Sequence, residues 1–171
     1  LILLDDSTFR LFGDSKFTNN AATFMINVKD DSNVYVEDTT FIDNNSFVMY
    51  SALQHYDDSY FKNCTFEGEE ALRWCYSEAG KTVVFENCVI NTNFRGFHFD
   101  DMKGDVLFKN CHINGFNAYG GEGTATFEGC TFGTDARSRY NGLNIYANTV
   151  LTDCTFIYKS GKTGQRIYLN K

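Results

Sequence analysis

Side chains that could transfer protons during sugar cleavage gather in the middle of the chain. Arg73 comes first, and Arg95, His98, Asp100 and Asp101 follow. An arginine or a histidine can act as a base, while carboxylates can protonate a leaving group or attack the sugar. We therefore take these five residues as candidate catalytic residues.

Carboxylates of the same region could instead hold calcium, which prefers several oxygen ligands. Asp57, Asp58, Asp100 and Asp101 form two such pairs. Asp-Asp pairs also recur elsewhere in the chain, always near a turn, and this recurrence favours ordinary solvated turn residues. We expect no cofactor other than calcium.

Aromatic residues offer a second kind of candidate site. In register and facing outward, Tyr76, Tyr119, Tyr146 and Tyr168 would form a ridge that, together with Trp74, stacks on sugars or on a protein partner. The alternative is that these tyrosines only cover the sheet as cross-strand pairs.

Strand alternation predicts which of these side chains are neighbours. It places Trp74 beside His98 and Tyr76 beside Asp100, about 5 Å apart in adjacent coils. Which side chains of these strands point outward stays open, because apolar residues occupy the same alternating positions as the polar candidates.

A phrase that occurs seven times must position these residues. It reads LFGDSKF (11–17), YVEDTTF (35–41), YFKNCTF (60–66), VFENCVI (84–90), LFKNCHI (107–113), TFEGCTF (126–132) and VLTDCTF (150–156). We call the fifth residue of each phrase its anchor; the anchors are Ser15, Thr39, Cys64, Cys88, Cys111, Cys130 and Cys154. Successive anchors are 24, 25, 24, 23, 19 and 24 residues apart. A period of this size is typical of a solenoid.

The columns of the phrase predict a corner. Three residues before the anchor stand Phe12, Val36, Phe61, Phe85, Phe108, Phe127 and Leu151; directly before it stand Asp14, Asp38, Asn63, Asn87, Asn110, Gly129 and Asp153. Apolar residues also stand two positions after the anchor. Both apolar columns can face inward only if the chain bends between them, and Asn, Asp and Gly tolerate the left-handed backbone of such a bend.

A further strand follows each phrase. It is expected at 23–28, 47–52, 72–77, 95–100, 142–147 and 165–170, with a shorter stretch at 117–120. Aligned backward, Ile2 and Leu4 fall where Ile26 and Val28 fall one coil later. Proline is absent from the chain, which agrees with stacked coils that use nearly every backbone N–H.

Five of the six cysteines share the anchor column. We expect an internal ladder of reduced thiols that pack as small apolar groups, because parallel side chains in a stack do not point toward each other. Zinc is not expected there, since its ligands must converge tetrahedrally. Cys75 lies in the further strand and is expected in the core.

Composition limits the partners. The formal net charge is −7 and basic residues are scattered, which argues against nucleic acid. No apolar run approaches the roughly 20 residues of a membrane span. The chain begins and ends in mid-coil, so we expect one domain, 1–171, cut from a longer solenoid whose neighbouring coils would cover both ends.

The phrase resembles right-handed parallel β-helix proteins of the pectin-lyase-like superfamily. FTNN (17–20) and FIDN (41–44), with INTN (90–93), also resemble the F-x-x-N signature of polymorphic outer-membrane and adhesin-like extracellular repeats. The resemblance implies an all-β, right-handed parallel β-helix of about seven coils of 19–25 residues. It also implies that enzymes of this fold would carry their acids and bases on one outward strand face.

We therefore expect a non-catalytic, extracellular module of a microbial surface or secreted adhesin-like protein that binds glycan or a partner protein. The alternative is a fragment of a polysaccharide lyase or glycoside hydrolase that uses the region around Arg73, Arg95, His98 and Asp100. A third reading is the β-helix of a phage tailspike. The acidity of the chain argues against a polyanionic substrate.

Overall fold

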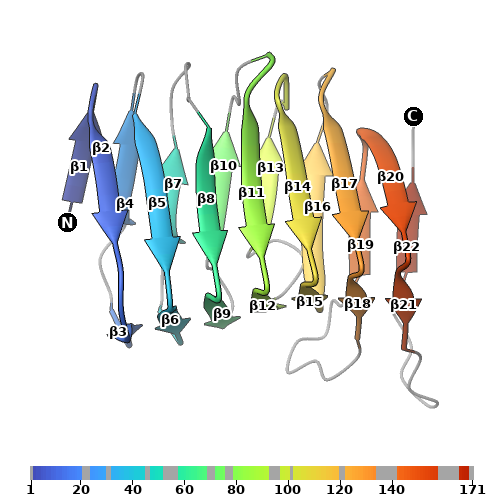
Figure 1. The fold of residues 1–171 in the computed structure, drawn as a ribbon, viewed down its shortest axis with the longest axis horizontal. Helices are drawn as coiled ribbons and strands as arrows, with labels where there is room; N and C mark the ends of the chain where they lie inside the picture. Colours follow the sequence, from blue (N-terminus) through green and yellow to red (C-terminus); the bar gives the residue numbers. More distant parts are fainter. Residues whose placement is uncertain are drawn as a thin grey trace.

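The computed structural model describes residues 2–20, 24–29, 32–44, 47–51, 58–68, 72–75, 79–92, 97–100, 102–119, 122–133, 142–157 and 166–169. These residues form strands that run in parallel in three sheets, with one strand of each sheet per coil (Figure 1). Within the described part of the chain, no segment is helical. The predicted all-β parallel solenoid is confirmed.

Sheet A contains the further strands of the sequence pattern. They are β1 (Ile2–Asp5), β4 (Phe24–Lys29), β7 (Phe47–Ser51), β10 (Leu72–Cys75), β13 (Phe97–Asp100), β16 (Gly115–Tyr119), β19 (Gly142–Ile145) and β22 (Arg166–Leu169). The backward alignment of the first coil is confirmed, because Ile2 pairs with Ile26 and Leu4 with Val28.

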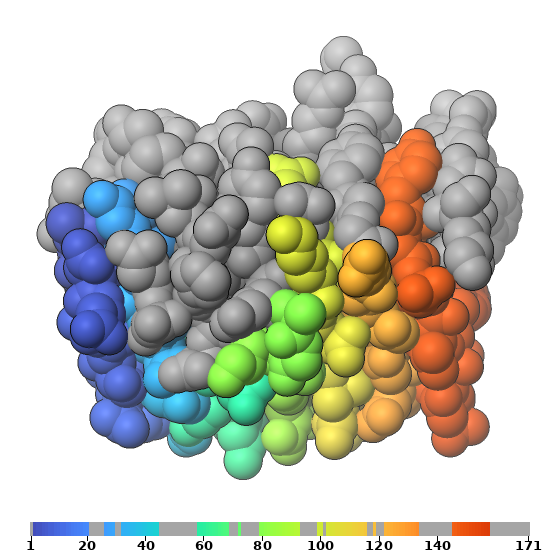
Figure 2. Space-filling model, turned by 90° about the horizontal axis from the view of Figure 1, so that it is seen from above, coloured from blue at the N-terminus to red at the C-terminus, as the bar shows by residue number. Residues whose placement is uncertain are grey.

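Sheets B and C divide the repeated phrase between them. Sheet B contains β2 (Thr8–Leu11), β5 (Asn33–Glu37), β8 (Ser59–Lys62), β11 (Thr82–Glu86), β14 (Asp105–Lys109), β17 (Thr124–Glu128) and β20 (Asn148–Thr152). Sheet C contains β3 (Ser15–Thr18), β6 (Thr39–Ile42), β9 (Thr65–Gly68), β12 (Val89–Thr92), β15 (His112–Ile113), β18 (Thr131–Phe132) and β21 (Thr155–Phe156). Coils follow one another along the long axis in sequence order (Figure 2).

The bend between sheets B and C has the predicted left-handed backbone. Positive φ angles of 50° to 62° occur at Asp38, Asn63, Asn87, Asn110, Gly129 and Asp153. The bend side chains also bond along the axis: Asn63 Nδ2 donates to Asp38 Oδ1 (2.9 Å), and Asn87 Nδ2 donates to Asn63 Oδ1 (3.3 Å). One left-handed residue resets the strand alternation, so apolar residues on both sides of it face inward.

The first coil departs from the predicted column. Leu11, and not Phe12, pairs with Val36, and the left-handed residue is Gly13 (φ 85°) instead of Asp14. One extra residue at this corner displaces Phe12 from the core, and its side chain is 52% exposed. The assignment of Phe12 to the inward column and of Asp14 to the bend column was therefore wrong.

Phenylalanine stacks fill the interior. Phe61, Phe85, Phe108 and Phe127 stack at centroid distances of 4.7, 5.0 and 5.0 Å. A second stack passes through Phe41, with Phe17 and Phe66 each at 5.2 Å. The two stacks meet edge to face, an arrangement that aromatic rings favour.

The asparagine of the F-x-x-N motif has a structural role. Asn44 is 4% exposed. Its Nδ2 donates to the carbonyl oxygen of Phe17 (3.1 Å), and its Oδ1 accepts from the backbone and side-chain nitrogens of Asn20 (3.1 and 2.9 Å). The motif thus joins neighbouring coils at the end of sheet C.

The shortest coil loses the corner between sheets C and A. Asn114 alone separates β15 from β16, whereas residues 93–96 separate β12 from β13 in the preceding coil. This explains the 19-residue spacing between His112 and its partner Thr131.

Candidate functional site

Sheet A brings polar residues of successive coils into one register column. Arg73 pairs with Tyr50 on one side and with His98 on the other, and His98 pairs with Asn117. The column continues through Asn144 to Tyr168 and begins with Leu3 and Asn27. Seven consecutive coils therefore contribute a residue that can form hydrogen bonds.

The flanking positions of these strands belong to the core. Ile26 and Val28, on either side of Asn27, are 0% exposed, and Leu72, Phe99, Ala118 and Ile145 are buried as well. Asn27 is only half-buried, yet its Oδ1 atom is shielded from solvent and lacks a hydrogen-bond partner among the described residues.

The predicted neighbours differ from the observed ones by one residue. His98 pairs with Arg73 and not with Trp74, whose partner is Phe99; Asp100 pairs with Cys75 and not with Tyr76. Hydrogen bonds between neighbouring strands set this register. From the sequence it could be derived only by counting residues from the anchors, and stretches of unequal length lie between the anchors and these strands. The predicted platform of Trp74 beside His98 was therefore wrong, while the proximity of Arg73 to His98 is an outcome that the sequence did not specify.

The tyrosine ridge is also not a single column. Tyr168 pairs with Asn144, and Tyr119 pairs with Asp100. Because Ala118 pairs with Ile145, Tyr119 and Tyr146 occupy corresponding positions, two residues away from the register of Tyr168. Tyr146 is 41% exposed, so part of the predicted aromatic surface remains.

Some candidates lie outside the described residues. These are Arg95, Asp57, Tyr76 and Asp101. Asp58 is described: its Oδ1 accepts a hydrogen bond from the backbone N–H of Thr82 (2.9 Å), as expected of a carboxylate that caps a turn. Among the described residues, no group of three or more His, Cys, Asp or Glu side chains could hold a metal ion.

The outer face of sheet B carries an aromatic pair that the sequence reasoning missed. Tyr35 and Tyr60 lie 5.0 Å apart, and the Arg10 guanidinium lies 5.2 Å from the Tyr35 ring centroid. Tyr60 also donates a hydrogen bond to Glu37 Oε1 (2.5 Å), which raises the pKa of the Tyr60 phenol. The signal was present, since both tyrosines begin the repeated phrase one position before an inward residue.

Opposite charges alternate beside this pair. Glu37, Lys62, Glu86, Lys109 and Glu128 are register partners in five successive coils. Lys109 Nζ lies 3.8 Å from Glu128 Oε2. Lys62, Glu86 and Lys109 each have opposite charges before and after them along the axis, which favours this register, although each exposed pair contributes little to stability. Side chains on this face mainly join coils to one another.

Parallel pairing in three sheets, a left-handed bend in each coil and continuous inward stacks define a parallel β-solenoid. The family model described as a right-handed beta helix region matches residues 2–122. The chain therefore belongs to the right-handed β-helix family. No curated protein and no solved structure matches the chain. In the part of the chain that the structure describes, no helix is long and apolar enough to cross a membrane.

Proposed function

We propose that the chain is a non-catalytic β-helix module of a microbial surface or secreted adhesin-like protein, and that it binds an extended glycan along sheet A. The observation that carries this proposal is the column Asn27, Tyr50, Arg73, His98, Asn117, Asn144 and Tyr168. It places one hydrogen-bonding residue in each coil, at intervals of about 4.8 Å. An extended polysaccharide offers hydroxyl groups at a comparable repeat.

A column of polar residues is better suited to binding an extended ligand than to catalysis. Catalysis of glycosidic cleavage needs an acid and a second carboxylate or a base on opposite sides of one bond. A column distributes its polar groups over many sugar residues, so that several weak contacts add up along one chain. Amide, guanidinium and aromatic groups are suited to orient sugars through hydrogen bonds and stacking.

Sheet B supports the scaffold part of the proposal. On its outer face Lys109 pairs with Glu128 and Tyr35 packs against Tyr60, so these side chains link neighbouring coils. Together with the backbone ladders of the three sheets, these contacts join the coils into a rod. A rod that presents one ligand face is consistent with a stalk of an extracellular protein, continued by neighbouring β-helix coils.

A glycan array and pull-down with insoluble polysaccharides test the proposal. The single variants His98→Ala and Asn144→Ala should each weaken binding about tenfold, because each removes a contact to one sugar residue. Tyr35→Ala, on sheet B, is the matched control and should bind like the wild type. Binding that depends on Tyr35 and not on His98, or the absence of any glycan ligand, would contradict the proposal.

The second candidate is a polysaccharide lyase or glycoside hydrolase. The pairing of Arg73 with His98, together with Asp100 two positions further along β13, is the observation that favours it. Pectin, alginate and glycosaminoglycans should be incubated with the chain, with and without calcium. Formation of unsaturated or shortened products that Arg73→Ala abolishes would replace the binding proposal with this one.

A further inference from the structure

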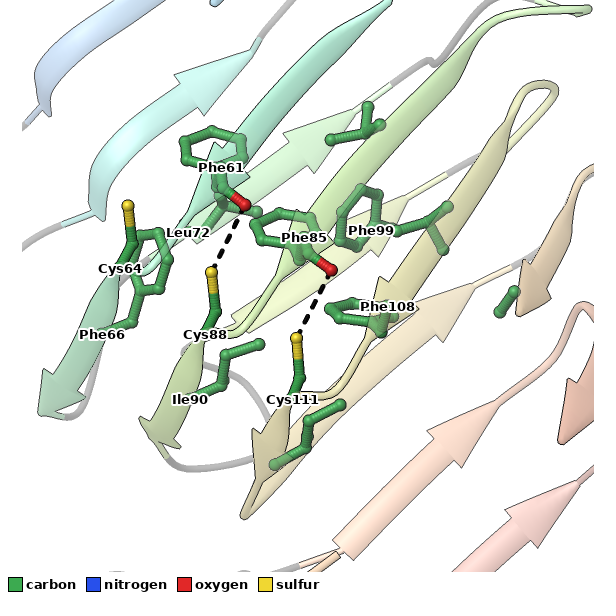
Figure 3. Packing of buried hydrophobic residues seen from close by; sticks show 14 of the residues in the cluster. Phe61, Cys64, Phe66, Leu72, Phe85, Cys88, Ile90, Phe99, Phe108 and Cys111 are labelled. Atoms are coloured by element: carbon green, nitrogen blue, oxygen red, sulfur yellow. Dashed lines mark hydrogen bonds between the residues drawn. The ribbon is translucent and has the colours of Figure 1, made fainter. Parts of the chain in front are cut away.

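Apolar side chains fill the inner side of sheets B and C. Figure 3 shows Phe61, Phe85 and Phe108 in the interior, beside the cysteines of the next corner. The free cysteines of the anchor column are Cys64, Cys88, Cys111, Cys130 and Cys154. The first four are at most 2% exposed, and successive thiols are one strand spacing apart, about 4.8 Å. The predicted ladder of reduced thiols is confirmed, and a surface for a partner must lie on the outer faces.

The outer face of sheet B carries an apolar column along its centre. The column consists of Tyr35, Tyr60, Val84 and Leu107, which are register partners in four successive coils. Each of these side chains is only partly buried, and Figure 1 shows the strands of sheet B as the near layer of the solenoid. A continuous row of outward aromatic and aliphatic side chains is typical of a surface that contacts a protein.

Polar columns flank this apolar column on both sides. Two residues before its members stand Asn33, Asp58, Thr82 and Asp105; two residues after them stand Glu37, Lys62, Glu86 and Lys109. All of these side chains share the outer face, because the alternation along a strand has a period of two. A coil with lysine on one side has aspartate on the other, and a coil with glutamate has a neutral asparagine or threonine.

Contacts within one chain do not explain this match between the two polar columns. Asp105 and Lys109 are the first and last residues of β14, so about 13 Å separates them, which is more than the Debye length at physiological salt. Neighbours along the axis explain why charges alternate within the column of Glu86 and Lys109. They do not explain why aspartate stands in the coils with lysine and not in the coils with glutamate.

We propose that sheet B is a dimerisation surface, on which a second copy of this chain packs face to face with the two solenoid axes parallel. A two-fold axis that runs along the solenoid, over the apolar column, places each coil opposite the same coil of the second copy. Tyr60, Val84 and Leu107 then meet their own counterparts, at the separation of about 10 Å that is usual for packed sheets.

This symmetry reverses the strand direction between the copies and so brings the two polar columns together. Asp58 faces Lys62 of the second copy, and Asp105 faces Lys109 of the second copy. The two-fold axis repeats each of these pairs. The coils in which lysine and aspartate occur together are therefore the coils in which they meet across the interface.

The glutamates of the intervening coils face neutral residues. Glu37 lies opposite Asn33 of the second copy, and Glu86 lies opposite Thr82. A shift of one copy by a single coil would instead place Glu86 opposite one of the aspartates. Because opposed carboxylates disfavour the shifted arrangement, charge selects the register in which equal coils meet.

The dimer leaves sheet A uncovered. Sheet A lies behind sheet B in Figure 1, so the polar column proposed to bind glycan points away from the second copy. The dimer does not depend on that proposed function, and either can fail without the other.

Sedimentation velocity over a series of concentrations tests the dimer. We expect the wild-type chain to show a monomer–dimer equilibrium. Val84→Ser should raise its Kd about tenfold or more, because both copies lose a side chain at the centre of the interface. Val89→Ser is the matched control: it makes the same change in the same coil, at a residue of sheet C that is 40% exposed, and should leave Kd unchanged.

Two charge variants test the arrangement. Asp105→Lys opposes two lysines across the interface, and Lys109→Glu opposes two carboxylates, so each variant alone should raise Kd about tenfold or more. An equimolar mixture of the two variants restores opposite charges at both places and should dimerise like the wild type. Asp105 Oδ1 also accepts a hydrogen bond from the Thr124 backbone N–H (2.8 Å), but a variant that only damages its own fold is not rescued by mixing.

These measurements have clear contrary outcomes. A wild-type chain that stays monomeric at millimolar concentration overturns the proposal. Equal effects of Val84→Ser and Val89→Ser, or no recovery of the dimer in the mixture of the charge variants, overturn it as well.

Discussion

The variant Phe85→Ala tests the central packing feature of the solenoid. Phe85 is 0% exposed. Its ring stacks on those of Phe61 and Phe108 at 4.7 and 5.0 Å, and it contacts Phe66 and Phe99 edge to face at 6.3 and 6.2 Å. Truncation to alanine removes all four ring contacts and leaves a cavity in the middle of the stack.

The size of the effect follows from these contacts. Truncation of a buried phenylalanine costs about 3–5 kcal/mol, and each aromatic pair is worth about 0.5–1.5 kcal/mol beyond its buried area. Parallel ladders on three sides hold the backbone of the coil, so the cavity cannot collapse easily. We therefore expect the upper half of the range, about 4–5 kcal/mol for Phe85→Ala.

Phe12→Ala is the matched control. Both residues stand three positions before an anchor, so the sequence pattern treats them alike. In the structure Phe12 is 52% exposed and lies outside the stack. Its truncation should cost about 1 kcal/mol or less.

Urea unfolding followed by far-UV circular dichroism distinguishes the two. With an m-value of about 2 kcal/mol/M, Phe85→Ala should lower the midpoint by about 2 M, and Phe12→Ala by less than about 0.5 M. Equal shifts for the two variants would refute the conclusion that an extra residue in the first coil displaces Phe12 from the core. A cost below about 1 kcal/mol for Phe85→Ala would refute the continuous stack.

Three further outcomes are expected. Gly123→Ala should lower the free energy of unfolding by about 3 kcal/mol, because its Cβ would overlap a backbone carbonyl oxygen. Gly80→Ala has φ 81° and open space around it, so it should cost only about 1–2 kcal/mol. Equal shifts of the melting temperature for the two variants would contradict this. Hydrogen bonding to a neighbouring thiol and burial raise the pKa of Cys88 above its ordinary 9.0. Its thiol therefore stays neutral in the fold while it ionises in the unfolded chain. The contribution of Cys88 to the free energy of unfolding should be fully present below about pH 9 and fall by about 1.4 kcal/mol per pH unit above it. Cys88→Ser should reduce the slope of the pH profile, and a profile parallel to that of the wild type would speak against this. The hydrogen bond to Glu37 raises the pKa of Tyr60, so Glu37→Gln should lower the midpoint of its ultraviolet titration, and an unchanged midpoint would count against the bond.

The repeat made most of the fold predictable, because every interior coil has the same environment and selects the same residue types. Bend residues at Asn63, Asn87 and Asn110, and thiols one residue later, follow directly from that requirement. The first coil was predictable only in part. Its extra residue is absorbed at a corner, and only the pairing of Leu11 with Val36 reveals where.

The candidate site was less predictable than the core. Loops of unequal length precede the strands of sheet A, so counting residues from the anchors could not determine the register there. The backbone hydrogen-bond ladder shifts the expected neighbours by one residue and pairs Arg73 with His98. The tyrosine pair on sheet B was predictable in principle, because Tyr35 and Tyr60 alternate with the inward Val36 and Phe61 in the phrase itself.

The amino-acid sequence by itself determined the period of the coil, the position of the bend and the identity of the inward columns, since these depend on local backbone preference and on burial repeated in every coil. Tertiary structure alone decided which residues of neighbouring coils lie side by side on sheet A. It also decided that the thiols are spaced by one strand and that Phe12 leaves the core. These outcomes depend on hydrogen bonds between strands far apart in sequence, and a register shift of one residue changes every neighbour without changing the pattern.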